Sequence, residues 1–412
     1  MSEFINNQTK RQEKLKEVIK KLHNGHEFSS LKEEFSELLN DASAREIAEM
    51  EQTLIAEGLP IQEIQHLCDI HVAMFREALD QQLPPEMTPG HPIYTMRAEN
   101  EFVVLLINDI KASLTAFKAS PPRDLRKKLI EKITQLRGYE RHYSRKENLL
   151  FPVLESYGFT GPTNVMWAIH DDIRRGWKKL QSMLSSEQEI TSALAAEVDD
   201  EFSKTENAIR EMIYKEDRIL FPNALEQLND DDWGKLYEQE TEIGFAFVTR
   251  GEEWQPQQKS DAYTTQDAIM PTLTKGEELA MVEVTLDTGK LSLEQVNLLL
   301  KNLPVDVTYV DENDTVLYYS AGKERIFTRT PAIIGRKVQN CHPPASVDRV
   351  QVILDDFRAG KRDTAEFWIQ MGGKFIHIRY FAIRDEQGKF RGTVEVSQDV
   401  TQIRELEGEK RL

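Results

Sequence analysis

A twelve-residue pattern occurs twice in this chain, at residues 141–152 and again at residues 211–222. Each copy places charged residues one to two helical turns ahead of an apolar run, and each run ends in Phe-Pro. This arrangement predicts that each copy lies near the end of a long helix. Between the copies, residues 167–174 have helical periodicity and contribute His170. Two similar helical hairpins that both carry possible metal ligands predict a four-helix bundle with an internal metal site.

The length and charge of the chain limit the classes of protein to which it can belong. A chain of 412 residues allows two to four domains. The formal net charge of −18 opposes electrostatic binding to nucleic acid or anionic lipid. The first residues have no apolar signal-peptide core, and no run of about 18 apolar residues occurs, so we expect no integral membrane segment. The two cysteines, Cys68 and Cys341, fall in different expected domains, which favours a reducing, cytoplasmic location without a structural disulfide.

Breaks in the sequence separate two helical regions. Amphipathic helical patterns fill residues 9–82 and predict a small all-α domain. The Pro-rich stretch at 83–90 cannot continue a helix, so we expect the four-helix bundle over residues 86–245. A polar linker at residues 246–281 follows it. The helices of the bundle are expected near residues 91–118, 123–157, 162–185 and 189–227.

Beyond the linker the periodicity changes to that of strands. Residues 305–310 and 315–319 predict a hairpin, and later strands are expected near residues 366–369, 375–383 and 392–397. Together with a preceding strand-helix segment, residues 282–405 predict an α+β domain with one antiparallel sheet, followed by a charged tail at 406–412. The predicted fold class is therefore multidomain, with an all-α N-terminal domain and a four-helix bundle followed by an α+β domain.

The bundle segment resembles the hemerythrin-like (HHE cation-binding) family. The residues that carry the resemblance are His91-Pro92, the Glu99-Asn100 pair, His142 through Pro152, His170, and Glu216 through Pro222. Members of this family hold two irons between four helices, through histidines from each helix and carboxylates from the second and fourth. Imidazole and carboxylate groups suit iron, and open coordination positions admit O₂, NO or peroxide.

The match to the metal-ligand pattern of that family is partial. Asn100, Lys146 and Met212 stand at positions where the resemblance implies ligands. One interpretation is a non-haem iron site, mono- or dinuclear and richer in carboxylates, built from His91, Glu99, His142, Glu147, His170, Glu206 and Glu216. The alternative is a bundle without metal, in which His142 and His170 are hydrogen-bonded within the core.

The two remaining segments also resemble known domains. Residues 282–405 resemble a PAS sensor domain in Ile333 through Arg336, in the strands that follow Phe375, and in Gln398 through Thr401. The first 80 residues resemble the uncharacterised helical domain that precedes hemerythrin-like modules in some bacterial proteins. Some PAS domains bind haem through a histidine or a Cys-Pro ligand, so Cys341 and His342 are candidate axial ligands. The alternative is that Pro343-Pro344 simply ends a helix in a turn.

The resemblance implies a cytoplasmic sensor rather than an enzyme. Its bundle would bind iron and respond to O₂, NO or redox state, and its PAS domain would sense a second signal or form a homodimer. The response would pass through a protein partner, with no role for nucleic acid. One alternative is an iron-handling or peroxide- or NO-detoxifying diiron protein, and another is a metal-free interaction scaffold. The sequence contains no phosphate-binding loop and no hydrolase nucleophile motif that would indicate other chemistry.

Overall fold

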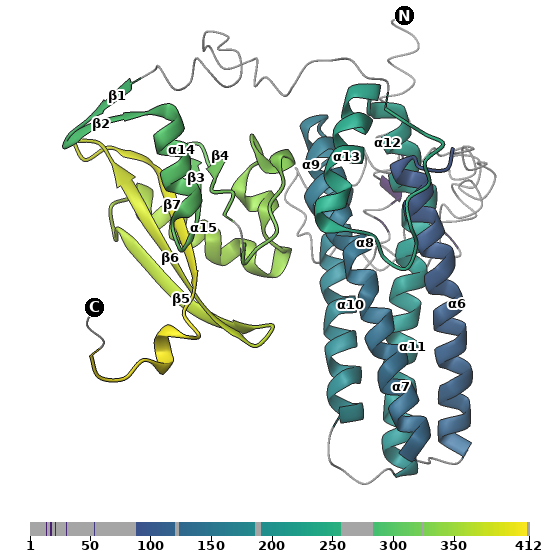
Figure 1. Cartoon of the computed structure of the whole chain (residues 1–412). Coiled ribbons are helices and arrows are strands. Elements are labelled where there is room, and N and C mark those ends of the chain that lie inside the picture. Colours follow the sequence, from purple (N-terminus) through teal and green to yellow (C-terminus); the bar gives the residue numbers. More distant parts are fainter. Residues whose placement is uncertain are drawn as a thin grey trace, which may run out of the picture. The chain divides into compact units, whose positions relative to one another are not determined.

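A computed structural model describes five ranges of the chain, residues 88–119, 123–185, 191–256, 283–322 and 325–409, together with the single residues Lys14, Glu17, Val18, Lys21, Ser30 and Thr53. Most of the expected domain at 9–82, including Cys68, therefore lies outside the described residues. The chain divides near Gln257 into two compact units (Figure 1). The predicted fold class is confirmed, because the described part of the first unit is helical and an antiparallel sheet organises the second.

In the described part of the first unit, the chain forms four long helical stretches and one shorter helix. Figure 1 shows α6, α7, α10 and α11 running side by side. The first stretch is α6 (Pro92–Ala119), and the third is α10 (Gly161–Ser185). The second consists of α7 (Arg123–Leu136), η1 (Arg137–Tyr139), α8 (Glu140–Arg145), η2 (Lys146–Leu150) and α9 (Phe151–Ser156). The fourth joins α11 (Ser192–Lys215), η3 (Glu216–Leu220) and α12 (Phe221–Gln227), and α13 (Asp230–Ile243) follows.

Local signals in the sequence fix where these helices begin and end. The side chain of Thr191 accepts a hydrogen bond from the N–H of Leu194 and so caps α11. Asn229 begins α13 through a reciprocal capping box with Asp232. Gly158 ends the second stretch with a φ of +89°, a backbone conformation that glycine adopts without strain.

The inner faces of the four stretches form one continuous apolar core. Its fully buried aromatic side chains include Phe117, Tyr139 and Phe202. Helices α10 and α11 pack closely at Gly176, where an added Cβ atom would lie 2.3 Å from Oγ1 of Thr205. A side chain larger than that of glycine at position 176 would therefore force Thr205 or the two helices to shift.

The second unit is built on a five-stranded antiparallel sheet with the strand order β4-β3-β7-β6-β5. Strands β3 and β7 pair closely at Gly392, where an added Cβ atom would lie 2.2 Å from the carbonyl oxygen of Val310. The strands are β3 (Asp306–Asp311), β4 (Val316–Tyr319), β5 (Thr364–Met371), β6 (Lys374–Arg384) and β7 (Phe390–Asp399). Between β4 and β5 lie η4 (Pro331–Ile333), η5 (Val338–Cys341) and α15 (Pro344–Arg358), and η6 (Ile403–Glu405) follows β7.

A short hairpin and a helix precede this sheet in the second unit. The hairpin pairs β1 (Glu283–Leu286) with β2 (Gly289–Ser292), and α14 (Leu293–Asn302) follows directly. Ser292 caps α14 through a capping box with Gln295, and no side chain of α14 is buried. Within the described ranges, no helix is both long and apolar enough to cross a lipid bilayer.

Candidate functional site

Five of the seven predicted metal ligands meet in one buried polar cluster in the core of the bundle. They come from five elements: Glu99 from α6, His142 from α8, Glu147 from η2, His170 from α10 and Glu216 from η3. No member of this set exposes more than 4% of its surface. A charged group in an apolar core costs several kcal/mol unless it is paired, so the partners of these side chains determine what the site can do.

Both copies of the Phe-Pro pattern contain a π-helical turn, η2 in the first copy and η3 in the second. A proline has no N–H group and its ring clashes with the carbonyl four residues earlier, so an α-helix cannot continue unchanged through Pro152 or Pro222. A π turn inserts one extra residue into the helix, and such turns are frequent at functional sites. In the first copy, the turn places two adjacent charged residues, Lys146 and Glu147, in the core.

His142 lies between two carboxylates. Its Nδ1 atom is 2.8 Å from Oε2 of Glu99, and its Nε2 atom is 3.1 Å from Oε2 of Glu216. Both ring nitrogens therefore lie within hydrogen-bonding distance of a carboxylate oxygen. The ring of Tyr139 stacks on the imidazole with 4.6 Å between the two centroids. These contacts fix the ring with Nε2 directed at Glu216.

His170 has a carboxylate on one ring nitrogen and faces the interior of the cluster with the other. Its Nδ1 atom is 2.7 Å from Oε1 of Glu147. Arg174 holds the same carboxylate through two N–H groups, each 2.9 Å from a different oxygen. Tyr143 stacks on the imidazole at a centroid distance of 4.2 Å. A histidine that is oriented in this way through Nδ1 resembles a metal-ligating histidine, in which Nε2 binds the ion.

Lys146 occupies the space between His170 and Glu216. Its side chain is fully buried, and Nζ donates a short hydrogen bond to Oε1 of Glu216 while lying 3.0 Å from Nε2 of His170. The other oxygen of Glu216 accepts a hydrogen bond of 2.8 Å from the side-chain amide of Asn100. The hydroxyl of Tyr139 donates to Oδ1 of Asn100 and thereby fixes which way the amide points.

The charge of Glu216 is stabilised by these partners. Burial alone would raise the pKa of its carboxyl group, but the adjacent Lys146 and His142 outweigh burial and hold the pKa at about 2. Burial lowers the pKa of the Lys146 ammonium, and Glu216 opposes that effect by attraction and by hydrogen bonding. Glu216 and Lys146 therefore form a buried ion pair.

Arg145 balances the negative charge of two carboxylates on the Nδ1 side of His142, away from Glu216. It donates a short hydrogen bond to Oε2 of Glu99 and another, of 2.9 Å, to Oε1 of Glu240. The second oxygen of Glu99 accepts from the N–H of Ala246 at 2.6 Å. Sequence reasoning did not identify Arg145 or Glu240, although Arg145 follows His142 by three residues and so shares its helix face.

Three family models match the chain in the order that the sequence predicts. They are the family of unknown function DUF438 over residues 15–81, the hemerythrin HHE cation binding domain over 91–224, and the PAS domain over 296–401. The chain therefore has three parts, with a hemerythrin HHE domain between a DUF438 domain and a PAS domain. The hemerythrin and PAS matches together support a metal-binding, sensor-like protein.

Several solved structures are similar to part of this chain. The C-terminal domain of a protein from Streptococcus mutans is 37% identical, covers 31% of this chain and 99% of its own, and has a TM-score of 0.30. The PAS domain of a protein from Colwellia psychrerythraea is 16% identical, with coverages of 27% and 98% and a TM-score of 0.22. The PAS domain of BvgS from Bordetella pertussis is 18% identical, with coverages of 27% and 89% and a TM-score of 0.23. The comparison with curated proteins found no match.

The donor set of the hemerythrin domain does not fit the two-iron centre that the resemblance implies. A metal ion needs several lone pairs that converge on one point. Among the residues that the structure describes, no group of three or more His, Cys, Asp or Glu side chains is arranged to hold one. Instead, hydrogen-bond donors face the buried carboxylates, namely the ammonium of Lys146, the amide of Asn100 and the guanidinium of Arg145.

Two of the predicted ligands lie outside the cluster. His91 precedes Glu99 by eight residues, or about 12 Å of helix. Its Nδ1 accepts from the N–H of Ile93, and its ring packs against Trp233 and Trp254. Burial in these surroundings lowers its pKa to about 4. Glu206 lies about 15 Å along the helix from Glu216 and forms ion pairs with Lys111 and Arg210.

The candidate haem ligands of the PAS domain are not among the residues that line a cavity in this domain. Nδ1 of His342 is 2.8 Å from the carbonyl oxygen of Val338, and Cys341 is half-buried with Sγ 3.6 Å from the carbonyl of Lys337. A cavity of about 20 Å³ in this domain has room for a single water molecule, whereas pockets for larger ligands measure at least about 300 Å³. Its lining consists of Val310, Val338, Val350, Ile353, Leu354, Tyr380, Thr393 and Glu395.

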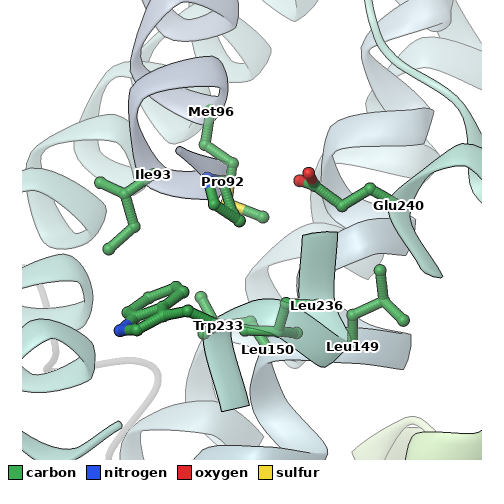
Figure 2. Close-up of a pocket in the computed structure, with 8 residues that line it drawn as sticks. All are labelled: Pro92, Ile93, Met96, Leu149, Leu150, Trp233, Leu236 and Glu240. Atoms are coloured by element: carbon green, nitrogen blue, oxygen red, sulfur yellow. The ribbon is translucent and has the colours of Figure 1, made fainter. Parts of the chain in front are cut away.

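One carboxylate oxygen of Glu240 lies in apolar surroundings. Figure 2 shows its carboxylate among residues such as Met96, Leu149 and Leu236. Oε1 bonds to Arg145, whereas Oε2 is buried without a hydrogen-bond partner among the described residues. Burial raises the pKa of Glu240 from 4.5 to about 7, although Arg145 opposes the shift.

Glu240 makes the stability of the bundle depend on pH. Between pH 4.5 and 7 the unfolded chain loses this proton while the folded chain keeps it, so the free energy of unfolding falls as pH rises through that window. We expect the wild type to lose about 3 kcal/mol relative to Glu240→Gln between pH 4.5 and 7.5. Urea unfolding of both proteins at several pH values measures the difference. Burial also raises the pKa of Glu147 to about 7, but this residue is present in both proteins and so contributes equally to both. A difference that stays constant with pH would contradict the prediction.

Proposed function

We propose that this protein is a regulatory protein that responds to a signal and transmits the response through protein contacts made by its PAS domain. The observation that carries this proposal is the distribution of exposed apolar side chains. Among the described residues, 16 large apolar side chains are exposed, and all but three of them lie in the second unit, between Leu286 and Leu406. Three of them, Phe367, Trp368 and Met371, lie on the single strand β5, and exposed apolar side chains that gather on one element mark sites of protein association.

Strand β5 is the part of this surface best suited to association with a second copy of the chain. It is an edge strand, since within the described sheet it pairs only with β6. It exposes Phe367, Trp368 and Met371, and Trp368 is 61% exposed. An edge strand offers unpaired backbone N–H and C=O groups, and two antiparallel copies satisfy one another around a twofold axis. We therefore infer that two copies of the chain form a homodimer through β5. This dimer would then bind a further protein partner.

Replacing Trp368 with arginine is expected to weaken this dimer. A buried tryptophan at the centre of an interface contributes about 2 kcal/mol or more, so the dissociation constant should rise at least about 30-fold. Light scattering coupled to size-exclusion chromatography measures the mass of the full-length protein across a dilution series. Val352, which is 56% exposed on α15, provides the matched control as Val352→Arg. A wild type that is monomeric at every concentration, or a Trp368→Arg protein that dimerises equally well, would contradict the proposal.

An iron site in the bundle, responding to O₂, NO or redox state, is the second candidate function. The observation that favours it is the orientation of His142 and His170, whose Nε2 atoms both face the region of Glu216. Two histidines and one carboxylate are a common ligand set for non-haem iron. This candidate requires the ammonium of Lys146 to leave its present position. Anaerobic purification with metal analysis tests this candidate. Iron that is present in the wild type and lost from a His142→Ala, His170→Ala variant supports it. A wild type that contains no iron contradicts it.

A further inference from the structure

The ammonium of Lys146 has the environment of a bound cation. One carboxylate oxygen of Glu216 accepts a short hydrogen bond from it, and the lone pair of Nε2 on His170 lies 3.0 Å away. The face of the Tyr143 ring lies 4.7 Å from Nζ and adds a cation–π contact. All three neighbours present negative charge or electron density. The side chain is fully buried, so water does not compete with these partners.

The imidazoles around this ammonium keep the orientation that metal ligands adopt. His170 binds Glu147 through Nδ1 at 2.7 Å, and His142 binds Glu99 through Nδ1 at 2.8 Å. Carboxylates in this position orient the ring and increase the basicity of Nε2 toward a cation. In His170 that nitrogen meets the nitrogen of Lys146.

Each carboxylate of the cluster that could hold a metal already has a cationic partner within the chain. Glu216 pairs with Lys146, Glu99 pairs with Arg145, and Glu147 pairs with Arg174. A divalent metal at Glu216 would lie beside several of these positive charges and would be repelled by them. The charges of the cluster are balanced by side chains alone.

From these contacts we infer that the ammonium of Lys146 takes the place of a metal ion in this hemerythrin-like bundle. It is a cation tethered to the chain, so the bundle reaches its full stability without metal. This inference goes beyond the role of the PAS domain in the proposed function. It also identifies the residue that prevents Glu216, His142 and His170 from binding an exogenous divalent cation.

Co²⁺ binding to the full-length protein tests the inference, since visible absorption reports the ligands of this ion. After treatment with a chelator, the wild type should show no saturable Co²⁺ spectrum. Lys146→Glu, which replaces the ammonium with a carboxylate, should bind about one Co²⁺ at least about 100-fold more tightly. Lys204→Glu makes the same charge change at an exposed residue of α11 and should behave like the wild type.

Two results would overturn the inference. One is a wild type that binds Co²⁺ stoichiometrically and loses it in the His142→Ala, His170→Ala variant. The other is a folded Lys146→Glu protein that binds no more tightly than the wild type. If Lys146→Glu does not fold, the melting temperature of the wild type in excess Co²⁺ tests the inference instead. A ligand that binds only the folded state raises the melting temperature. An unchanged temperature in excess Co²⁺ supports the inference, and an increase that requires His142 and His170 overturns it. The dimer test at Trp368 is independent of all these outcomes.

Discussion

Replacing Lys146 with methionine is expected to lower the free energy of unfolding of the bundle by about 3–5 kcal/mol. The two side chains have similar volume, so the change removes the charge and the hydrogen bonds without leaving a large cavity. Glu216 would then be fully buried without its nearest cation. The cost of a buried charge that loses its partner exceeds the net stabilisation that the pair provides, which explains the large expected effect.

Urea unfolding followed by circular dichroism at the helical band measures this loss, since most described helical residues belong to the bundle. A second change, Glu216→Gln, should restore part of the stability of Lys146→Met, because it removes the unpaired charge. Lys204→Met breaks an exposed pair with Asp200 and is expected to cost less than about 1 kcal/mol. A Lys146→Met protein within about 1 kcal/mol of the wild type would show that the ammonium is not paired in the core.

Replacing Arg145 with methionine is expected to cost a similar amount, about 3–5 kcal/mol. Arg145 is fully buried, and its guanidinium bridges Glu99 and Glu240, which come from α6 and α13. Without Arg145, Glu240 can become neutral by keeping its proton. Glu99 would lose the cation that is paired with it and would keep only His142 and the N–H of Ala246 as partners. Most of the loss should therefore arise at Glu99.

The same unfolding measurement tests this prediction, and the chain provides a matched control on α10. Arg175 forms an ion pair with Asp172 and is 66% exposed, so Arg175→Met should change stability by less than about 1 kcal/mol. Adding Glu240→Gln to Arg145→Met should recover little stability at pH 7. A large recovery would assign the cost to Glu240 instead of Glu99.

Much of the candidate site could be predicted from the sequence because its members occur in recognisable helical patterns. His142, His170 and Glu216 each lie in a segment whose apolar spacing marks a bundle helix, and the structure brings them together as expected. The separation of His91 and Glu206 from the others follows from the helical rise of 1.5 Å per residue. The role of Asn100 could not be predicted, since its amide is oriented by Tyr139 from a different helical stretch.

The repeated Phe-Pro pattern determined by itself that this chain contains paired helix ends around a polar core, because proline and apolar periodicity act within a few residues. The sequence also placed Lys146 where a ligand was expected, and it left open whether that side chain would reach the interior. Only the tertiary structure decided that question. The direction of a buried lysine depends on a π turn and on partners from other helices, Glu216 and His170, which no local pattern contains. Paired across helices in this way, the lysine provides the positive charge that the carboxylates of the core require.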